Sequence, residues 1–323
     1  MECTRRDFTK LALAGTAAAG LEKVFAASAP DAARRPDSLI NGVQIGTITY
    51  SYRSMRDQSA DATLKYVVDS GISAIELMSG PAEEFAGAPP AGRVGGSGRQ
   101  QTPEQQALQR ASAEQLKQWR LSVSMDKYRA LRKKYNDAGV TIYAWKCLNP
   151  RMSDQEIEYV FIVAEALGCT HTTLELTDDV AQLKRIGGFA EKHKIYAAYH
   201  THLQGGMTVF DRAFAASTGN MANIDVGHYV AAGNVGGTTL QFLQKHHDRV
   251  ASFHLKDRTT PEHGAKNLPW GSGDTPVTEI LQLVKKNGWK MPATIEFEYD
   301  VPPGSDAVKE VQKCLAYCRT ALA

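Results

Sequence analysis

Polar side chains stand near the ends of successive apolar segments in the second half of this sequence, where a buried strand would normally contribute to the core. Each of them is costly in an apolar interior unless it is paired or bound to a metal ion. Carboxylate and imidazole groups gathered in one place can bind a divalent cation such as Mn²⁺, Co²⁺ or Zn²⁺. The pattern predicts a metal site with ligands drawn from Glu175, His200, Asp225, His254 and Glu296.

Not every polar residue in these segments is expected to be a ligand. Glu175 can bind the metal, orient a histidine or bind substrate, and Glu76 in "AIELM" has the same alternatives, with a salt bridge favoured. His228 follows Asp225 by three residues in "NIDVGHYV", and we expect it in a loop just outside the metal. A single strand histidine is more often a core residue than a ligand, and this interpretation applies to His171, His193, His246, His247 and His263.

Eight short apolar segments alternate with helix-like stretches. The apolar segments are the predicted strands, and they must position the candidate ligands. Eight β–α units close most economically into a parallel barrel, because closure removes both sheet edges. We therefore predict an α/β fold, a single-domain (β/α)8 TIM barrel over residues 30–323. Strand carboxyl ends would then meet at one mouth, together with their polar residues. The predicted strands are 43–50, 72–78, 140–146, 171–176, 195–202, 221–228, 250–257 and 292–299.

The alternative to a barrel is an open doubly wound sheet. That fold requires a Gly-rich phosphate turn after the first strand, and "TITYSYRSM" contains none. Helix boundaries support the β–α repeat: Ser153 with Glu156 predicts a capping box, and Gly168 predicts the end of the same helix. One segment departs from the repeat. Residues 79–106 are rich in Gly and Pro, and we expect a flexible insertion at the barrel mouth, either a lid or a tolerated loop.

The first 29 residues have the pattern of an export signal. Arg5 and Arg6 precede a run of small apolar residues, and Ala27-Ser28-Ala29 resembles a cleavage site. The segment resembles a twin-arginine leader, which implies transfer by the twin-arginine export machinery to the periplasm or beyond. The apolar run is too short to span a bilayer, so no stable membrane anchor is expected.

Composition limits the class of protein. The chain has 323 residues, of which 43% are hydrophobic and 22% charged, so it can build a sizeable core. A net charge of +2 is too balanced to indicate binding of nucleic acid. The five cysteines include no CxxC pair, so no disulfide framework is predicted.

Four short motifs, "IDVGH", "HLKDR", "WGSGD" and "IEFEY", resemble the xylose isomerase-like TIM barrels known as sugar phosphate isomerases/epimerases. The resemblance covers residues 40–323. It implies metal ligands on strands five to eight, of which the last three fall on Asp225, His254 and Glu296. The strand-five position, a glutamate in the family, is His200 here. Such a "HxH" strand is similar to the inosose dehydratase-like and keto-sugar-processing branches.

The resemblance implies a sugar or keto-sugar substrate. A metal ion that polarises a carbonyl favours removal of the neighbouring proton, through an enediolate. Glu296 or His200 can act as the base, and Glu298 or His228 can return the proton. Lys256 can neutralise charge on oxygen or form a salt bridge with an acid such as Asp257. The remaining predicted substrate contacts are His202, Arg258 and Trp270.

Three functions remain open from the sequence. The first is a metal-dependent isomerase or epimerase of a free or keto-sugar. The second is a lyase or hydrolase that begins with the same proton abstraction and expels a substituent from a keto-glycoside. The third is a carbohydrate-binding barrel without catalysis. A DNA-repair endonuclease of the same superfamily is a weaker alternative, because an exported protein meets little DNA.

Overall fold

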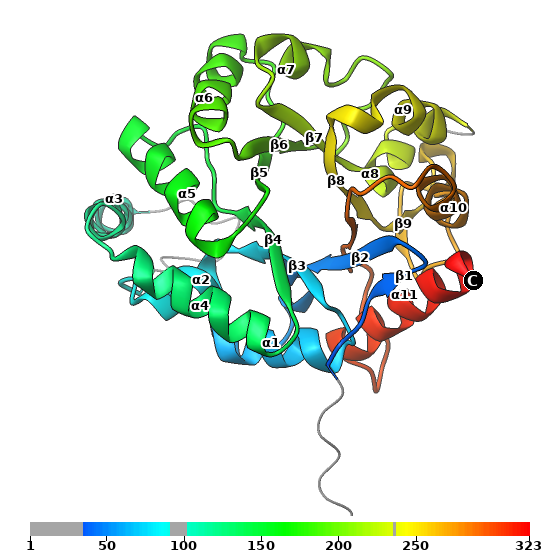
Figure 1. The fold of residues 1–323 in the computed structure, drawn as a ribbon, viewed down its shortest axis with the longest axis horizontal. Helices are drawn as coiled ribbons and strands as arrows, with labels where there is room; N and C mark the ends of the chain where they lie inside the picture. Colours follow the sequence, from blue (N-terminus) through cyan, green and yellow to red (C-terminus); the bar gives the residue numbers. More distant parts are fainter. Residues whose placement is uncertain (1–34, 91–101, 235–236) are drawn as a thin grey trace, which may run out of the picture. The chain divides into compact units, whose positions relative to one another are not determined.

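Eight parallel strands close into a barrel in the computed structural model, which describes residues 35–90, 102–234 and 237–323 (Figure 1). The sheet runs β1-β2-β11-β8-β7-β6-β5-β4-β3, and pairing of β2 with β3 closes it. β1 (Leu39–Ile40) is an antiparallel addition to β2. The barrel strands are β2 (Val43–Ile48), β3 (Ala74–Met78), β4 (Thr141–Lys146), β5 (His171–Glu175), β6 (Tyr196–His200), β7 (Asn220–Asp225), β8 (Val250–Leu255) and β11 (Ala293–Ile295).

Helices surround the barrel, as Figure 1 shows. They are α1 (Ala60–Asp69), α2 (Ser79–Ala86), α3 (Pro103–Arg120), α4 (Met125–Asp137), α5 (Asp154–Leu167), α6 (Val180–His193), α7 (Asp211–Ala216), α8 (Val226–Ala231), α9 (Thr238–His246), α10 (Val277–Asn287) and α11 (Ala307–Leu322). Short 3-10 turns are η1 (Thr49–Tyr52), η2 (His247–Arg249) and η3 (Pro261–His263). A small antiparallel pair, β9 (Asp257–Arg258) with β10 (Asn267–Leu268), follows β8.

The predicted barrel is confirmed: seven of the eight predicted segments contain one of its strands, and the sixth overlaps β7 over residues 221–225. The predicted capping box at Ser153 is confirmed too, and Gly168 ends α5 with a φ of 77°. The sixth predicted segment begins one residue after the start of β7 and runs three residues past its end. The strand ends at Asp225, and α8 begins at Val226, so His228 lies on a short helix and not in a loop.

The predicted loop over residues 79–106 is wrong at both ends. Ser79–Ala86 form α2, which ends at Gly87 with a φ of 92°. Thr102 and Gln105 make a capping box that starts α3, with Pro103 in its first turn. Residues 91–101 lie outside the described residues, as do residues 1–34 with the predicted leader. Within the described ranges, no helix is long and apolar enough to cross a membrane.

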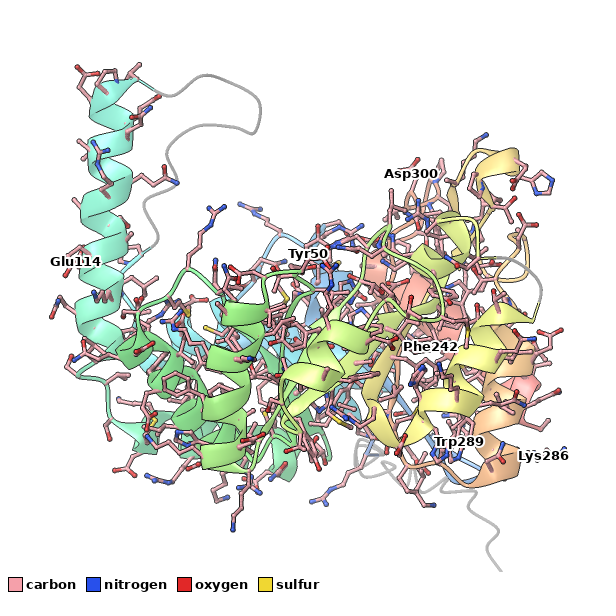
Figure 2. All side chains as sticks on the ribbon, turned by 90° about the horizontal axis from the view of Figure 1, so that it is seen from above. Tyr50, Glu114, Phe242, Lys286, Trp289 and Asp300 are labelled. Carbon is pink, nitrogen blue, oxygen red and sulfur yellow. The ribbon has the colours of Figure 1, made fainter. Side chains whose placement is uncertain are left out.

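Helix α3 projects from the barrel on the side where the strands end. Figure 2 shows α3, marked by Glu114, rising on the same side as Tyr50 and Asp300, which follow β2 and β11. None of its 18 residues is buried. Trp289, which precedes β11, marks the opposite end of the barrel.

The barrel interior is filled by side chains from facing strands. Tyr143 of β4 is buried, and its hydroxyl lies 2.7 Å from Thr294 Oγ1 of β11. Gly46 of β2 makes room for this ring, because a Cβ there would lie 2.7 Å from Tyr143 Cε1. The interior is therefore a packed core, and space for a ligand has to be found at the mouth.

Candidate metal centre

Four of the five predicted ligands meet at the carboxyl ends of the strands. Each offers one ligand atom, and these atoms all lie within 4.8 Å of one another. All four side chains are buried. They stand at the ends of the neighbouring strands β6, β7 and β8 and just after β11, and they are His200, Asp225, His254 and Glu296.

The motif "DVGH" shapes one side of this cluster. Asp225 Oδ1 accepts the backbone N–H of His228 at 2.7 Å and so caps α8, which leaves Oδ2 for the cluster. Gly227 allows α8 to pack on β8, because a Cβ there would lie 2.4 Å from Lys256 Cγ. The close approach brings His228 Nε2 to 3.1 Å from Lys256 Nζ.

His254 is held between two carboxylates. Its Nε2 lies 2.7 Å from Glu76 Oε2, and its Nδ1 lies 2.8 Å from Glu296 Oε2. Burial alone would lower the pKa of His254, but the two carboxylates raise it to about 10. A carboxylate at each nitrogen and the raised pKa mean that both ring nitrogens carry a proton in the metal-free cluster. A metal ion would replace the proton on Nδ1, which faces the cluster, while Glu76 keeps the proton on Nε2. A carboxylate behind a histidine is a common support of metal ligands.

Glu76 is the functional residue whose role the sequence left open. The expected salt bridge is present: Glu76, on β3, pairs with His254, on β8, across the interior of the barrel. Glu76 has no exposed surface, and its Oε1 accepts a hydrogen bond from Thr173 Oγ1 at 2.6 Å. Its position inside an apolar strand was the available signal, because a fully buried carboxylate requires a partner.

Lys256 brings a positive charge into the same cluster. Its Nζ lies 3.0 Å from Asp225 Oδ2, 2.8 Å from Glu296 Oε2 and 2.6 Å from Glu298 Oε2. Burial would raise the pKa of Glu296, but Lys256 and then His254 hold it well below its usual range. Burial has the larger effect on Asp225 and raises its pKa to about 6. Asp257, the partner suggested from sequence, is engaged elsewhere.

The residues present fit a divalent ion. His200 Nδ1 is buried without a hydrogen-bond partner among the described residues, and burial holds its pKa well below the usual range, so the ring is a neutral donor. Asp225 Oδ2 is paired with Lys256 by charge but has no hydrogen-bond partner. Two imidazoles and two carboxylates form a donor set suited to Mn²⁺, Co²⁺ or Zn²⁺.

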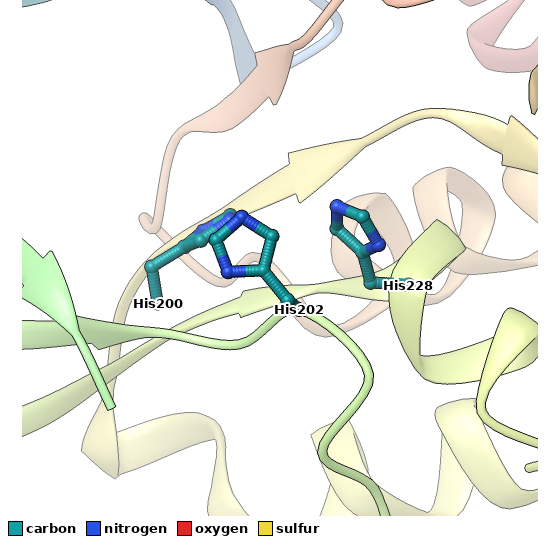
Figure 3. A group of neighbouring side chains, drawn as sticks. All are labelled: His200, His202 and His228. Carbon is teal, nitrogen blue, oxygen red and sulfur yellow. The ribbon is translucent and has the colours of Figure 1, made fainter. Parts of the chain in front are cut away.

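A second group of possible ligands lies beside the first. Figure 3 shows the rings of His200, His202 and His228 in a row, with centroids 5.0 Å and 4.9 Å apart along it. Lys256 and Arg258 both contact His228, and burial followed by these two cations lowers its pKa to about 2. Lys256 borders both groups, but only the first contains two carboxylates that offset its charge, so the first is the better cation site.

Glu175 is not brought into either group. It ends β5 half-exposed, where its carboxylate pairs with Lys146 at 2.9 Å and with His202 Nδ1 at 2.9 Å. The hydrogen bond from His202 to Glu175 raises the pKa of the imidazole. Of the alternatives left open for Glu175, the structure favours the orientation of a histidine.

The motifs "HLKDR" and "WGSGD" are joined by Asp257. Its Oδ2 accepts the backbone N–H groups of Gly271, Ser272 and Gly273, which holds the second motif beside β9. This loop directs Trp270 towards Tyr317 of α11, with ring centroids 5.8 Å apart. No contact between Trp270 and the cluster is found in the described part of the chain.

Comparisons with known proteins agree with the barrel fold. The family model of the xylose isomerase-like TIM barrel matches residues 64–318. A search of curated protein sequences found no significant match. Similar solved structures include a sugar phosphate isomerase/epimerase from Parabacteroides distasonis, with 16% identity, a TM-score of 0.55 and coverage of 85% of this chain and 93% of that one.

Two further structures are similar in fold. A probable 3-DHS dehydratase of petrobactin synthesis from Bacillus anthracis has 13% identity and a TM-score of 0.59, over 85% of this chain and 98% of that one. D-psicose 3-epimerase from Clostridium cellulolyticum has 10% identity and a TM-score of 0.56, over 87% of this chain and 99% of that one. The fold and the cluster define an α/β barrel with its polar site at the strand carboxyl ends. The chain belongs to the xylose isomerase-like TIM barrel family.

Proposed function

We propose that the protein is a divalent-metal-dependent isomerase or epimerase that acts on a free or keto-sugar by removing a proton next to a carbonyl. The observation that carries the proposal is the buried cluster of two imidazoles and two carboxylates at the barrel mouth. When bound there, a divalent ion supplies a Lewis acid that polarises a carbonyl oxygen. His200, Asp225, His254 and Glu296 would hold it.

Glu296 is assigned the role of the general base that removes the proton from the substrate carbon. Its carboxylate is ionised and lies at the edge of the cluster, 2.8 Å from Lys256 Nζ, so it can accept a proton from carbon. Lys256 contacts Glu298 as well, and either group can return a proton to the substrate. His228 is held neutral and orients the Lys256 ammonium, and Arg258 with His202 lies beside it for contact with hydroxyls.

A lyase that acts on 3-keto-glycosides or inososes is the second candidate, and the imidazole of His200 favours it. An epimerase with two carboxylates needs an acid and a base on opposite sides of one carbon. His200 stands where the second carboxylate would be, and burial holds its pKa well below the usual range, so the neutral ring has no extra proton to give. An elimination instead needs one base and one group that protonates the leaving oxygen, which suits Glu296 and Lys256.

The first test joins metal analysis to proton exchange. We expect about one divalent ion per chain in the mature protein and less in Asp225→Ala. In deuterated water, NMR of free and 3-keto sugars should show deuterium at the carbon next to the carbonyl. A rearranged sugar supports the isomerase, and loss of a substituent supports the lyase. Sugar binding without any exchange would contradict both and leave a carbohydrate-binding barrel.

We also propose that the protein is exported by the twin-arginine machinery and that residues 1–29 are then removed. The paired Arg5 and Arg6, followed by a run of small apolar residues, support this. Intact-mass measurement of the protein from its native host should give a chain that begins near residue 30. A full-length mass, or export that persists in Arg5→Lys/Arg6→Lys, would show that the segment is no such leader.

A further inference from the structure

A cavity of about 510 Å³ opens beside the barrel mouth, outside the metal cluster. Its walls are η1 after β2, α2 and the residues that follow it, and one residue of α3. The volume is in the range of small-molecule sites. Another cavity, lined by Arg132, Asn136 and Gly139, lies where β4 begins, at the opposite end of the barrel.

The cavity wall is largely apolar. Tyr50 lines the cavity and is 38% exposed, whereas most large aromatic side chains of the described residues are buried. The Arg53 guanidinium lies 4.6 Å from the centre of the Tyr50 ring and fixes its orientation. The other apolar lining residues are Met78, Pro81, Ala88, Pro89, Pro90 and Leu116.

Two of the polar residues in the wall are already engaged. Gln58 Nε2 donates to two backbone carbonyl groups, those of Tyr52 and Met55. Glu83 accepts from Arg120 at 2.7 Å and from Tyr159 at 3.1 Å. Fewer hydrogen-bonding groups are therefore left for the hydroxyls of a second sugar ring. Among the described lining residues the remaining carboxylate is that of Glu84, which is exposed, and no buried charge without a partner is found.

Arg53 joins the cavity to the metal cluster. Its Nη1 donates to the backbone carbonyl oxygen of Phe297 at 2.6 Å. Phe297 stands between Glu296 and Glu298, and Ser51 Oγ accepts its backbone N–H at 3.0 Å. Hydrogen bonds thus join the cavity wall to the backbone of the segment that carries Glu296 and Glu298.

We infer that this cavity binds an uncharged aromatic substituent of the sugar, so that the substrate is an aryl glycoside in its keto form. The inference rests on the proposed function for the position of the sugar ring at the cluster. The substituent would be buried against Tyr50, Leu116 and the prolines, where aromatic and apolar surface leaves water.

Binding of unreactive probes tests this without turnover. In calorimetric titrations of the metal-loaded mature protein, phenyl β-glucopyranoside should bind at least about tenfold tighter than methyl β-glucopyranoside, because only the phenyl ring buries apolar area. Leu116→Trp puts a larger side chain into the space for the phenyl ring and should reduce this preference to about twofold or less. Leu108→Ala is the matched control, since Leu108 lies on the same helix, 62% exposed and outside the cavity lining.

Three outcomes would overturn the inference: equal affinity for the phenyl and methyl probes, cellobiose binding as tightly as the phenyl probe, or Leu108→Ala acting as strongly as Leu116→Trp. The proposed function fails separately. A phenyl preference that is lost in Leu116→Trp, together with no proton exchange on any keto-sugar, would keep the aromatic cavity and remove the isomerase and lyase.

Discussion

Glu296→Gln is expected to lower turnover by about 10²–10⁴-fold, the usual effect of removing a positioned general base. Glutamine keeps the size of the side chain and one oxygen, so His200, Asp225 and His254 should still hold the ion, less tightly. What is lost is the negative charge that accepts the proton from carbon. The measurement is the rate of turnover and of proton exchange in deuterated water, as metal concentration is raised.

Glu298→Gln is the matched control, because Glu298 pairs with Lys256 at 2.6 Å but lies outside the group of possible ligands. We expect a smaller loss there. Full recovery of Glu296→Gln at saturating metal would mean that Glu296 acts as a ligand alone, and the base would then be His200 or Glu298. Proton exchange without product in Glu296→Gln would place Glu296 after proton removal, as the acid, and would favour the lyase.

Lys256→Met is expected to destabilise the metal-free protein by about 3–5 kcal/mol, the usual cost of removing one partner from a buried ion pair. The Lys256 side chain is 3% exposed and lies within 3.0 Å of Asp225, Glu296 and Glu298. Without its ammonium, these carboxylates repel one another. A divalent ion would neutralise two of them, so added metal should restore much of the loss.

Urea unfolding with a chelator and with excess metal measures this effect. Lys146→Met is the matched control: the Lys146 side chain is 22% exposed and its partner Glu175 is 51% exposed. A pair so accessible to water should contribute about 1 kcal/mol or less, with no dependence on metal. If Lys256→Met loses the same stability with and without metal, the ion and the ammonium do not act on the same carboxylates, and the proposed metal centre is in the wrong place.

The strand pattern of the sequence was enough to predict the barrel and most of the candidate ligands. Strand side chains alternate between two faces, and the strands of a barrel end at one mouth. Polar residues at the ends of β6, β7 and β8 and just after β11 therefore had to face one another. His200, Asp225, His254 and Glu296 could be chosen on this ground, before any distance was known.

Some ends of helices and strands could be predicted from the sequence, and others could not. The capping box at Ser153 and the glycine end at Gly168 depend on a few neighbouring residues, and both were correct. The Gly and Pro content of residues 79–106 predicts a loop, but Pro81 is tolerated in the first turn of α2 and Pro103 in that of α3. His228 was placed in a loop because the capping of α8 by Asp225 was not recognised.

Side-chain partners were decided by the tertiary structure. Glu76 meets His254 across 178 positions of the chain, because the closed barrel brings β3 and β8 to opposite walls of one narrow interior. The same closure places Lys256 among three carboxylates, while Glu175 points to Lys146 and His202 at the rim. The sequence by itself determined which residues face inward, since that follows from alternation along each strand. Which of them touch depends on strand register and on the depth of each side chain, and these exist only once the barrel is closed.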